Sequence, residues 1–224
     1  MRPRRQGEEP QAEGRMSVLE DAKKIAERLT GVGRPKPAEL SQCVRERVPQ
    51  RYRFAPAGLV PNHPHWPLVH YRSVARFVEG IDPAALFEDL FARNGWSDSW
   101  RNGVYDYLHY HSRIHEVMGV ARGSAVVQFG GRSGRKLRVK AGDVVVLPAG
   151  TGHERISASQ DFLVVGAYPA TGTYDVCKPT EDAYRRATKT VPRVPPPRKD
   201  PVYGKDGRLI SLWKKRTRPV KTRR

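Results

Sequence analysis

Between residues 104 and 168 the chain alternates short apolar runs with glycine-rich breaks and shows no helical period. The runs that we expect to form strands cover residues 104–111, 116–121, 125–129, 136–140, 144–147 and 162–168. Turn residues separate the runs at intervals of roughly ten residues, which is typical of an antiparallel sandwich or barrel. Because no helical segment lies between the runs, a parallel α/β fold is excluded.

A helix is predicted just before this region. Asp82 is a good N-cap, Pro83 stands at the favoured first position, and Gly95 ends the segment. The apolar positions between them have helical spacing and are Leu86, Leu90 and Phe91. Shorter signals predict a helix from Ser17 toward Gly31, a strand at residues 68–71, a helix at 181–188 and an extended proline-rich segment at 191–197.

Composition adds limits to this picture. The chain has 224 residues with 38% hydrophobic residues, 20 glycines and 19 prolines, which indicates one loop-rich or β-rich domain with polar extensions. No run approaches the roughly 18 apolar residues of a membrane-spanning helix, and the start carries no apolar segment, so we expect no membrane span and no secretory signal. The two cysteines, Cys43 and Cys177, lie far apart in the sequence and give no disulfide framework. We therefore expect the protein in the reducing cytoplasm. Met16 is an alternative start to Met1.

The charge is strongly basic, with 41 Lys and Arg against 23 Asp and Glu and a formal net charge of +18. Residues 214–224 contain no acidic residue, and we expect both this tail (from residue 216) and residues 1–15 to be disordered. The tail is either a solubilising segment or an arm that binds nucleic acid. The absence of interleaved aromatic residues favours the first interpretation.

Candidate chemistry lies in a group of histidines. His109 and His111 are two residues apart on an expected strand, so both imidazoles leave the same face and can meet one metal ion. His153, past another hairpin, adds a third nitrogen donor. Spacing alone leaves open whether His115 or Glu116 completes the site, because the residues between 111 and 115 break the strand.

These residues match the two sequence motifs of the cupin family. The first motif, G-x5-H-x-H-x4-E-x6-G, is matched by Gly103, His109, His111, Glu116 and Gly123. The second, G-x5-P-x-G-x2-H-x3-N, is matched by Gly142, Pro148, Gly150 and His153, with Ser157 in place of the final Asn. Further segments, such as YRFAP at 52–56 and WRNGV at 100–104, resemble an uncharacterised bacterial group, the YjlB-like cupins.

The resemblance implies a mainly β fold: a single cupin (jelly-roll) β-barrel with a few flanking α-helices. It places residues 52–213 in one cupin unit, with a barrel core at about 100–170, between a polar, partly helical extension at 1–51 and a basic tail at 214–224. It also implies one divalent transition metal (Fe, Mn, Ni, Zn or Cu) held by His109, His111, Glu116 and His153, and it leaves His115 outside the ligand set.

Function follows less directly, because cupins host many chemistries. The metal set favours a metal-dependent enzyme of the dioxygenase, isomerase or lyase type that acts on a small polar or anionic metabolite. The alternatives are a cupin that binds or senses a small molecule without catalysis, and a nucleic-acid-associated protein that uses residues 214–224. Arg155 is a candidate to grip a substrate carboxylate, and Tyr105 and Tyr107 either orient the ligand or pack the barrel interior.

The family resemblance also predicts a homodimer. On the expected strand 104–111, Leu108 and Tyr110 lie on the face opposite the histidines. A lone barrel would leave these apolar side chains exposed, and a second copy would cover them.

Overall fold

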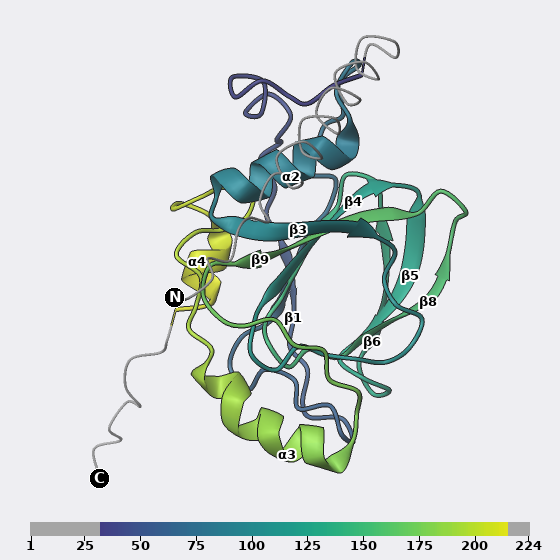
Figure 1. Cartoon of the computed structure of the whole chain (residues 1–224), viewed down its shortest axis with the longest axis vertical. Coiled ribbons are helices and arrows are strands. Elements are labelled where there is room, and N and C mark those ends of the chain that lie inside the picture. The colour runs from purple at the N-terminus through teal and green to yellow at the C-terminus, as the bar shows by residue number, and fades with distance from the viewer. Residues whose placement is uncertain (1–31, 215–224) are drawn as a thin grey trace, which may run out of the picture.

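The apolar runs form two antiparallel sheets that face each other in the computed structural model, which describes residues 32–214 (Figure 1). The larger sheet has six strands, in spatial order β1 (Gln50–Tyr52), β2 (Leu68–Tyr71), β7 (Val144–Leu147), β4 (Glu116–Arg122), β9 (Leu163–Pro169) and β3 (Trp96–Asn102). The smaller sheet has the order β6 (Arg135–Lys140), β5 (Ser124–Phe129) and β8 (His153–Ala158). The predicted mainly β, jelly-roll fold is confirmed.

Strand alternation divides the buried side chains into two clusters. On β7, Val145 and Leu147 point between the two sheets, whereas Val144 and Val146 point to the outer face of the larger sheet. That outer face is covered by helix α2 (Pro83–Arg93) and by the C-terminal segment with helix α4 (Arg208–Leu212). The larger sheet is therefore buried on both faces, which explains the continuous apolar runs of β4, β7 and β9.

The predicted strand at 104–111 is wrong. In place of a regular strand, His109 forms an isolated bridge with His153 and Tyr110 forms one with Cys177. The backbone of His109 pairs with one segment and that of Tyr110 with another, so this stretch forms no continuous ladder of hydrogen bonds with a neighbouring strand. The other predicted strands lie within one residue of β2, β4, β5, β6, β7 and β9. β1, β3, β8 and the helix α4 were not predicted, and β3 (WSDSWRN) is too polar to give an apolar signal.

Both helices predicted within the described residues are present. Asp82 caps α2 by accepting hydrogen bonds from the backbone N–H groups of Ala84 and Ala85. Helix α3 (Glu181–Thr190) begins where predicted and runs two residues further. The predicted extended segment at 191–197 begins instead with a short 3-10 helix, η1 (Val191–Arg193), because Pro192 fits the first turn of a helix. The predicted helix at 17–31 and the predicted disorder of 1–15 and 216–224 lie outside the described residues.

Part of the segment assigned to the N-terminal extension packs on the barrel unit. Leu40 and Cys43 are buried in the outer cluster with side chains of α2 and the larger sheet. The boundary at residue 51 stays a prediction. Within residues 32–214 no helix is both long and apolar enough to cross a membrane.

The apolar face proposed for dimer contact is already covered by this chain. Tyr110 is fully buried and packs with Ala187 and Val191, at and just beyond the end of α3. Leu108 is half-buried. The reason given for a homodimer at this face is therefore wrong, because α3 performs the covering that was assigned to a second copy.

Candidate metal centre

Three histidines meet in the mouth of the barrel. His109, His111 and His153 each offer one ring nitrogen, and the three nitrogens lie within 4.8 Å of one another. All three side chains are buried. His153 is the first residue of β8, and its backbone pairs with that of His109, which brings the two rings to a centroid distance of 4.0 Å. The three histidines are arranged to hold a metal ion.

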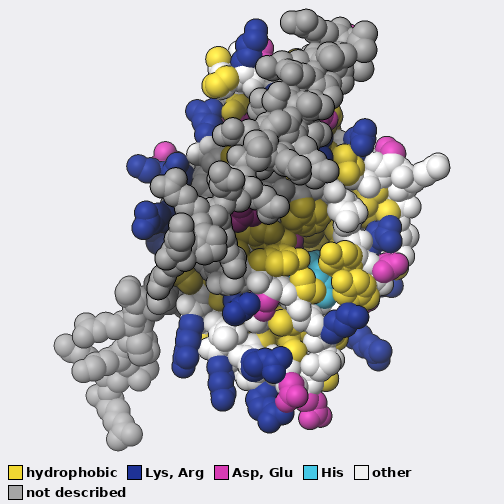
Figure 2. Space-filling view, in the orientation of Figure 1, with side chains coloured by type: hydrophobic (Ala, Val, Ile, Leu, Met, Phe, Trp, Pro, Cys, Tyr) yellow, Lys and Arg dark blue, Asp and Glu magenta, His cyan; other side chains and the backbone are white. Residues whose placement is uncertain are grey.

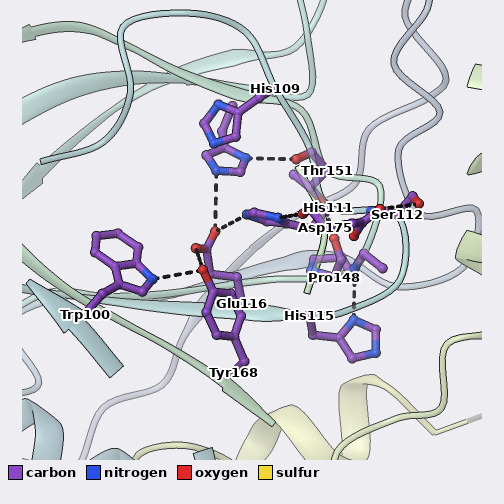
Figure 3. Close-up of polar contacts among 12 residues, drawn as sticks. Trp100, His109, His111, Ser112, His115, Glu116, Pro148, Thr151, Tyr168 and Asp175 are labelled. Carbon is purple, nitrogen blue, oxygen red and sulfur yellow. Dashed lines mark hydrogen bonds and ion pairs between the residues drawn. The ribbon is translucent and has the colours of Figure 1, made fainter. Parts of the chain in front are cut away.

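Backbone carbonyls orient each imidazole. Nδ1 of His109 lies 3.0 Å from the Tyr107 carbonyl oxygen and Nδ1 of His153 lies 3.0 Å from that of Thr151. Nδ1 of His111 bonds to the carbonyl of Asp175 (Figure 3). A carbonyl only accepts hydrogen bonds, so each Nδ1 carries the proton and each neutral ring presents the lone pair of Nε2. This is the tautomer that a metal-binding histidine needs.

Glu116 lies beside these nitrogens. It is the first residue of β4 and shares the inward face of that strand with Met118. Its Oε2 atom lies 3.4 Å from Nε2 of His111 and 3.4 Å from Nε2 of His153, and it has no hydrogen-bond partner among the described residues. An acceptor oxygen that is buried against acceptor nitrogens is unfavourable unless a cation lies between them. The donor set therefore fits a metal ion.

The pKa values of Glu116 and the histidines also indicate that this site favours positive charge. Burial acts to raise the pKa of Glu116, but positive charge at His111 and His153 outweighs it and holds that pKa well below its usual range. Burial acts to lower the pKa of His111, but the Glu116 carboxylate outweighs it and raises that pKa. His109 lies farther from the carboxylate, and burial together with His153 lowers its pKa to about 3. The carboxylate thus favours a cation at the His111 and His153 side.

His115 lies on the other side of β4's start. Its Nδ1 accepts a hydrogen bond from the Ala149 N–H at 2.9 Å, and its Nε2 donates to the Pro195 carbonyl at 3.1 Å. Its ring contacts both Trp66 and Trp213, at centroid distances of 5.5 and 4.9 Å. Burial lowers its pKa to about 4, so it is a neutral, fully bonded core residue. The structure therefore places Glu116, and not His115, beside the three imidazoles.

The cavity next to this cluster has a volume of about 590 Å³. Its wall is formed largely by aromatic and apolar side chains, and Figure 2 shows this hollow with histidine at its edge. The aromatic residues of the wall are Trp100, Tyr105, Tyr168 and Tyr174. A volume between about 300 and 1,000 Å³ suits a small metabolite.

Comparison with known proteins gives the family. The cupin family model matches residues 100–172. The uncharacterized protein YjlB of Bacillus subtilis (strain 168) is 41% identical over 170 residues, which cover 76% of this chain and 99% of YjlB. The chain belongs to the YjlB-like cupins. This match confirms the predicted family resemblance and leaves the reaction open, since YjlB itself is uncharacterised.

Solved structures show more distant likenesses to this cupin. Acireductone dioxygenase from Bacillus anthracis is 18% identical with a TM-score of 0.28, over 39% of this chain and 62% of that one. The TDP-fucose-3,4-ketoisomerase WlaRA from Campylobacter jejuni is 12% identical with a TM-score of 0.31, over 43% of this chain and 74% of that one. At TM-scores this low, neither likeness supports a statement about the reaction.

The three residues proposed to contact substrate lie in different surroundings. Tyr105 lines the cavity of this cupin and is 43% exposed, and Tyr107 stacks on it at a centroid distance of 4.9 Å. Arg155 is absent from the cavity wall, and its guanidinium lies 3.7 Å from the Asp106 carboxylate. The register of β8 against β5 shifts only after Arg155, so alternation along the strand still gives Arg155 the face of His153, and its contact with a substrate stays a prediction.

Two residues that sequence reasoning missed support the carboxylate of Glu116. The Tyr168 hydroxyl donates to Oε1 of Glu116 at 3.4 Å and accepts from Nε1 of Trp100 at 2.9 Å (Figure 3). Trp100 reaches this position by lying flat on Gly166, where any Cβ atom would come within 2.1 Å of its ring. The contact leaves Oε2 of Glu116 to face the histidines.

Asp175, also missed, supports His111 from outside the cluster. Its carbonyl bonds to the His111 ring, and its carboxylate accepts hydrogen bonds from the backbone N–H groups of Ser112 and Arg113 and from the Ser112 hydroxyl. The segment after β9 thereby fixes the loop that carries His111. Removal of this segment would free the His111 ring to rotate.

We expect the Tyr168→Phe substitution to weaken divalent-metal binding by about tenfold, the lower end of the range for residues that support metal ligands. The reason is that Oε1 of Glu116 loses its donor and the carboxylate is no longer held in one orientation. Competition with a chelating dye would measure the affinity. Tyr203→Phe removes a hydroxyl that bonds to backbone groups of Arg45 and Arg47, far from the cluster, and serves as control. Equal affinities for both variants would contradict the supporting role.

A second expectation concerns His63, which stacks on Trp66 at 4.3 Å and whose pKa burial lowers to about 3. The unfolded chain binds a proton at this residue near pH 6.5, so the free energy of unfolding must fall as the pH drops below 6.5. We expect His63 alone to account for a loss of about 1.6 kcal/mol between pH 6.5 and 5.0. In His63→Asn this part of the pH dependence should vanish from urea titrations. An unchanged pH profile would show that His63 does not stay neutral in the fold.

Proposed function

We propose that this cupin is a metal-dependent enzyme of the dioxygenase, isomerase or lyase type that acts on a small polar or anionic metabolite. In this proposal His109, His111, Glu116 and His153 bind one divalent transition metal. The single observation that carries the proposal is the unpartnered, buried Oε2 of Glu116 among imidazole nitrogens whose lone pairs face it. Three nitrogens and one carboxylate suit Fe(II), Mn(II), Ni(II), Zn(II) or Cu(II). Such an ion supplies a Lewis acid or a binding site for dioxygen.

The preference for an anion is proposed to come from the metal centre. One Glu116 carboxylate leaves a divalent ion with net positive charge in a low-dielectric site. Arg155 lies outside the cavity wall, and the guanidinium of Arg101, at the rim, is already paired with Glu88 and Asp82. The aromatic wall, including Tyr105 and Tyr174, is proposed to contact the body of the ligand.

Metal content and ligand charge can be tested together. The full chain is produced without a histidine tag, its metal content is measured by elemental analysis, and thermal unfolding is followed with benzoate or propionate and with the matched neutral amides. Stabilisation by the acids alone, and only in metal-loaded protein, is expected, with a gain of about 2.7 kcal/mol at 100 times Kd. Equal stabilisation by acids and amides would contradict the anion preference.

Catalysis itself is tested by product formation. Metal-loaded protein and protein stripped by a chelator are incubated with a metabolite pool, and each pool is compared by mass spectrometry. A mass change that depends on the metal supports an enzyme. Binding without any such change would support the alternative, a non-catalytic small-molecule binding cupin.

We also propose that the protein acts in the cytoplasm, which its cysteine usage favours, and that it forms a homodimer, as the family resemblance implies. The contact face is not the one around Tyr110, which α3 covers. Light scattering at micromolar concentration tests the dimer, and the mass of a monomer would contradict it.

A further inference from the structure

Two basic hollows flank the edge strand β6, and neither shares a wall residue with the metal cavity. The hollow at the C-terminal end of β6 is lined by Arg45, Arg76, Arg138 and Lys140. The hollow at its N-terminal end is lined by Arg51, Arg53 and Arg135. Lys136 lies on the strand between them and is exposed. We call these eight side chains the β6 basic surface; β6 is an edge strand of the smaller sheet.

The eight cations have little compensation within the described part of the chain. None of them forms a salt bridge there. The one carboxylate on the wall of either hollow is that of Asp161, which accepts a hydrogen bond from the Ser159 hydroxyl. One of them, Arg135, lies over the Tyr52 ring at 5.4 Å from its centroid. Cations gathered without ion-pair partners repel one another, and an anionic partner relieves that repulsion.

Protection of a sheet edge does not account for this surface. Lysines on an edge strand do prevent pairing with other chains, and Lys136 and Lys140 fit that role. Four of the cations, however, come from segments far earlier in the sequence: Arg45 precedes β1, Arg51 and Arg53 lie in and just after β1, and Arg76 follows β2. The fold places these four side chains at the two ends of β6. Protection of the strand edge does not require cations from other segments.

The shape of the surface indicates an extended partner. β6 has six residues and spans roughly 20 Å, so a compact anion would occupy one hollow and leave the other empty. Aromatic side chains also line each hollow, Phe77 in one and the half-buried Tyr52 and Phe54 in the other. We propose that the β6 basic surface binds single-stranded nucleic acid through its backbone phosphates, without reading sequence.

The test compares two triple variants of the full chain. Lys136, Arg138 and Lys140 are changed to Gln in one, and Arg185, Arg186 and Lys189 on α3 are changed to Gln in the other. Both sets are exposed, and both variants lose three positive charges while keeping residues 214–224. Fluorescence anisotropy with a labelled 20-nucleotide DNA strand at 50 mM salt is expected to show at least tenfold weaker binding for the β6 variant and at most twofold for the α3 variant.

The salt dependence gives a second readout. The slope of log K against log salt should become shallower by about two for the β6 variant, since each phosphate contact contributes about 0.7 for single strands. Equal weakening by both variants would overturn the proposal and leave net charge or the tail as the cause. Displacement of the strand by pyrophosphate at equal phosphate concentration would overturn it in favour of a compact anion site. Binding to phosphatidylserine vesicles but not to DNA would overturn it in favour of a membrane surface.

Discussion

The His111→Gln substitution is expected to lower the affinity for divalent metal by at least about 100-fold. Loss of a supporting residue already costs about 10–100-fold, and His111 is a direct donor that also pairs with Glu116 at 3.4 Å. Glutamine retains a polar side chain of similar length but cannot present the Nε2 lone pair. Elemental analysis after gel filtration, followed by competition with a chelating dye, would measure the change.

Two further histidines serve as controls for His111→Gln. His65 is exposed and lies outside the cluster, so His65→Gln should leave metal content unchanged. His115→Gln should lower the unfolding midpoint, because ring contacts with Trp66 and Trp213 and two hydrogen bonds are lost, yet folded protein should still bind metal. Metal loss in His115→Gln with retention in His111→Gln would reverse the ligand assignment.

Glycine-rich turns made the core of the fold readable from sequence. The break at Gly130 and Gly131 separates β5 from β6, and both glycines have positive φ, which other residues rarely adopt. β7 is apolar at every position because both of its faces are buried. β3 could not be found in this way, since its polar side chains are exposed and its place is set by backbone pairing with β9. The pattern of apolar residues along a chain indicates which segments are buried, and most residues of β3 are exposed.

The histidine cluster was predictable, but its supports were not. The motif spacing brought His109, His111 and His153 together even though the strand assumed to carry the first two is absent. Tyr168 alternates onto the inward face of β9, a signal that strand parity could have given. Asp175 gave no signal, because its contact with His111 joins residues 64 positions apart through a backbone carbonyl. Contacts made by the main chain carry no side-chain signature.

Replacing Trp213 with Ala is expected to destabilise the fold by about 3–5 kcal/mol, the usual range for a buried tryptophan. The Trp213 side chain is 1% exposed, stacks on Trp66 at 5.4 Å and donates from Nε1 to the Pro67 carbonyl at 2.9 Å. The truncation leaves a cavity and an unsatisfied buried carbonyl. Urea titration followed by circular dichroism would measure the loss.

Trp213→Phe separates the two causes if the alanine variant does not fold. It keeps an aromatic ring on Trp66 but removes the N–H donor, so a smaller loss of about 1–3 kcal/mol is expected. Val48 is 82% exposed, and Val48→Ala should change the free energy of unfolding by less than about 0.5 kcal/mol. If Trp213→Ala proved as stable as Val48→Ala, the C-terminal segment would not belong to the folding unit. The predicted cupin unit ending at residue 213 would then have to end earlier, because Trp213 is, within residues 32–214, the last side chain in the outer cluster of the larger sheet.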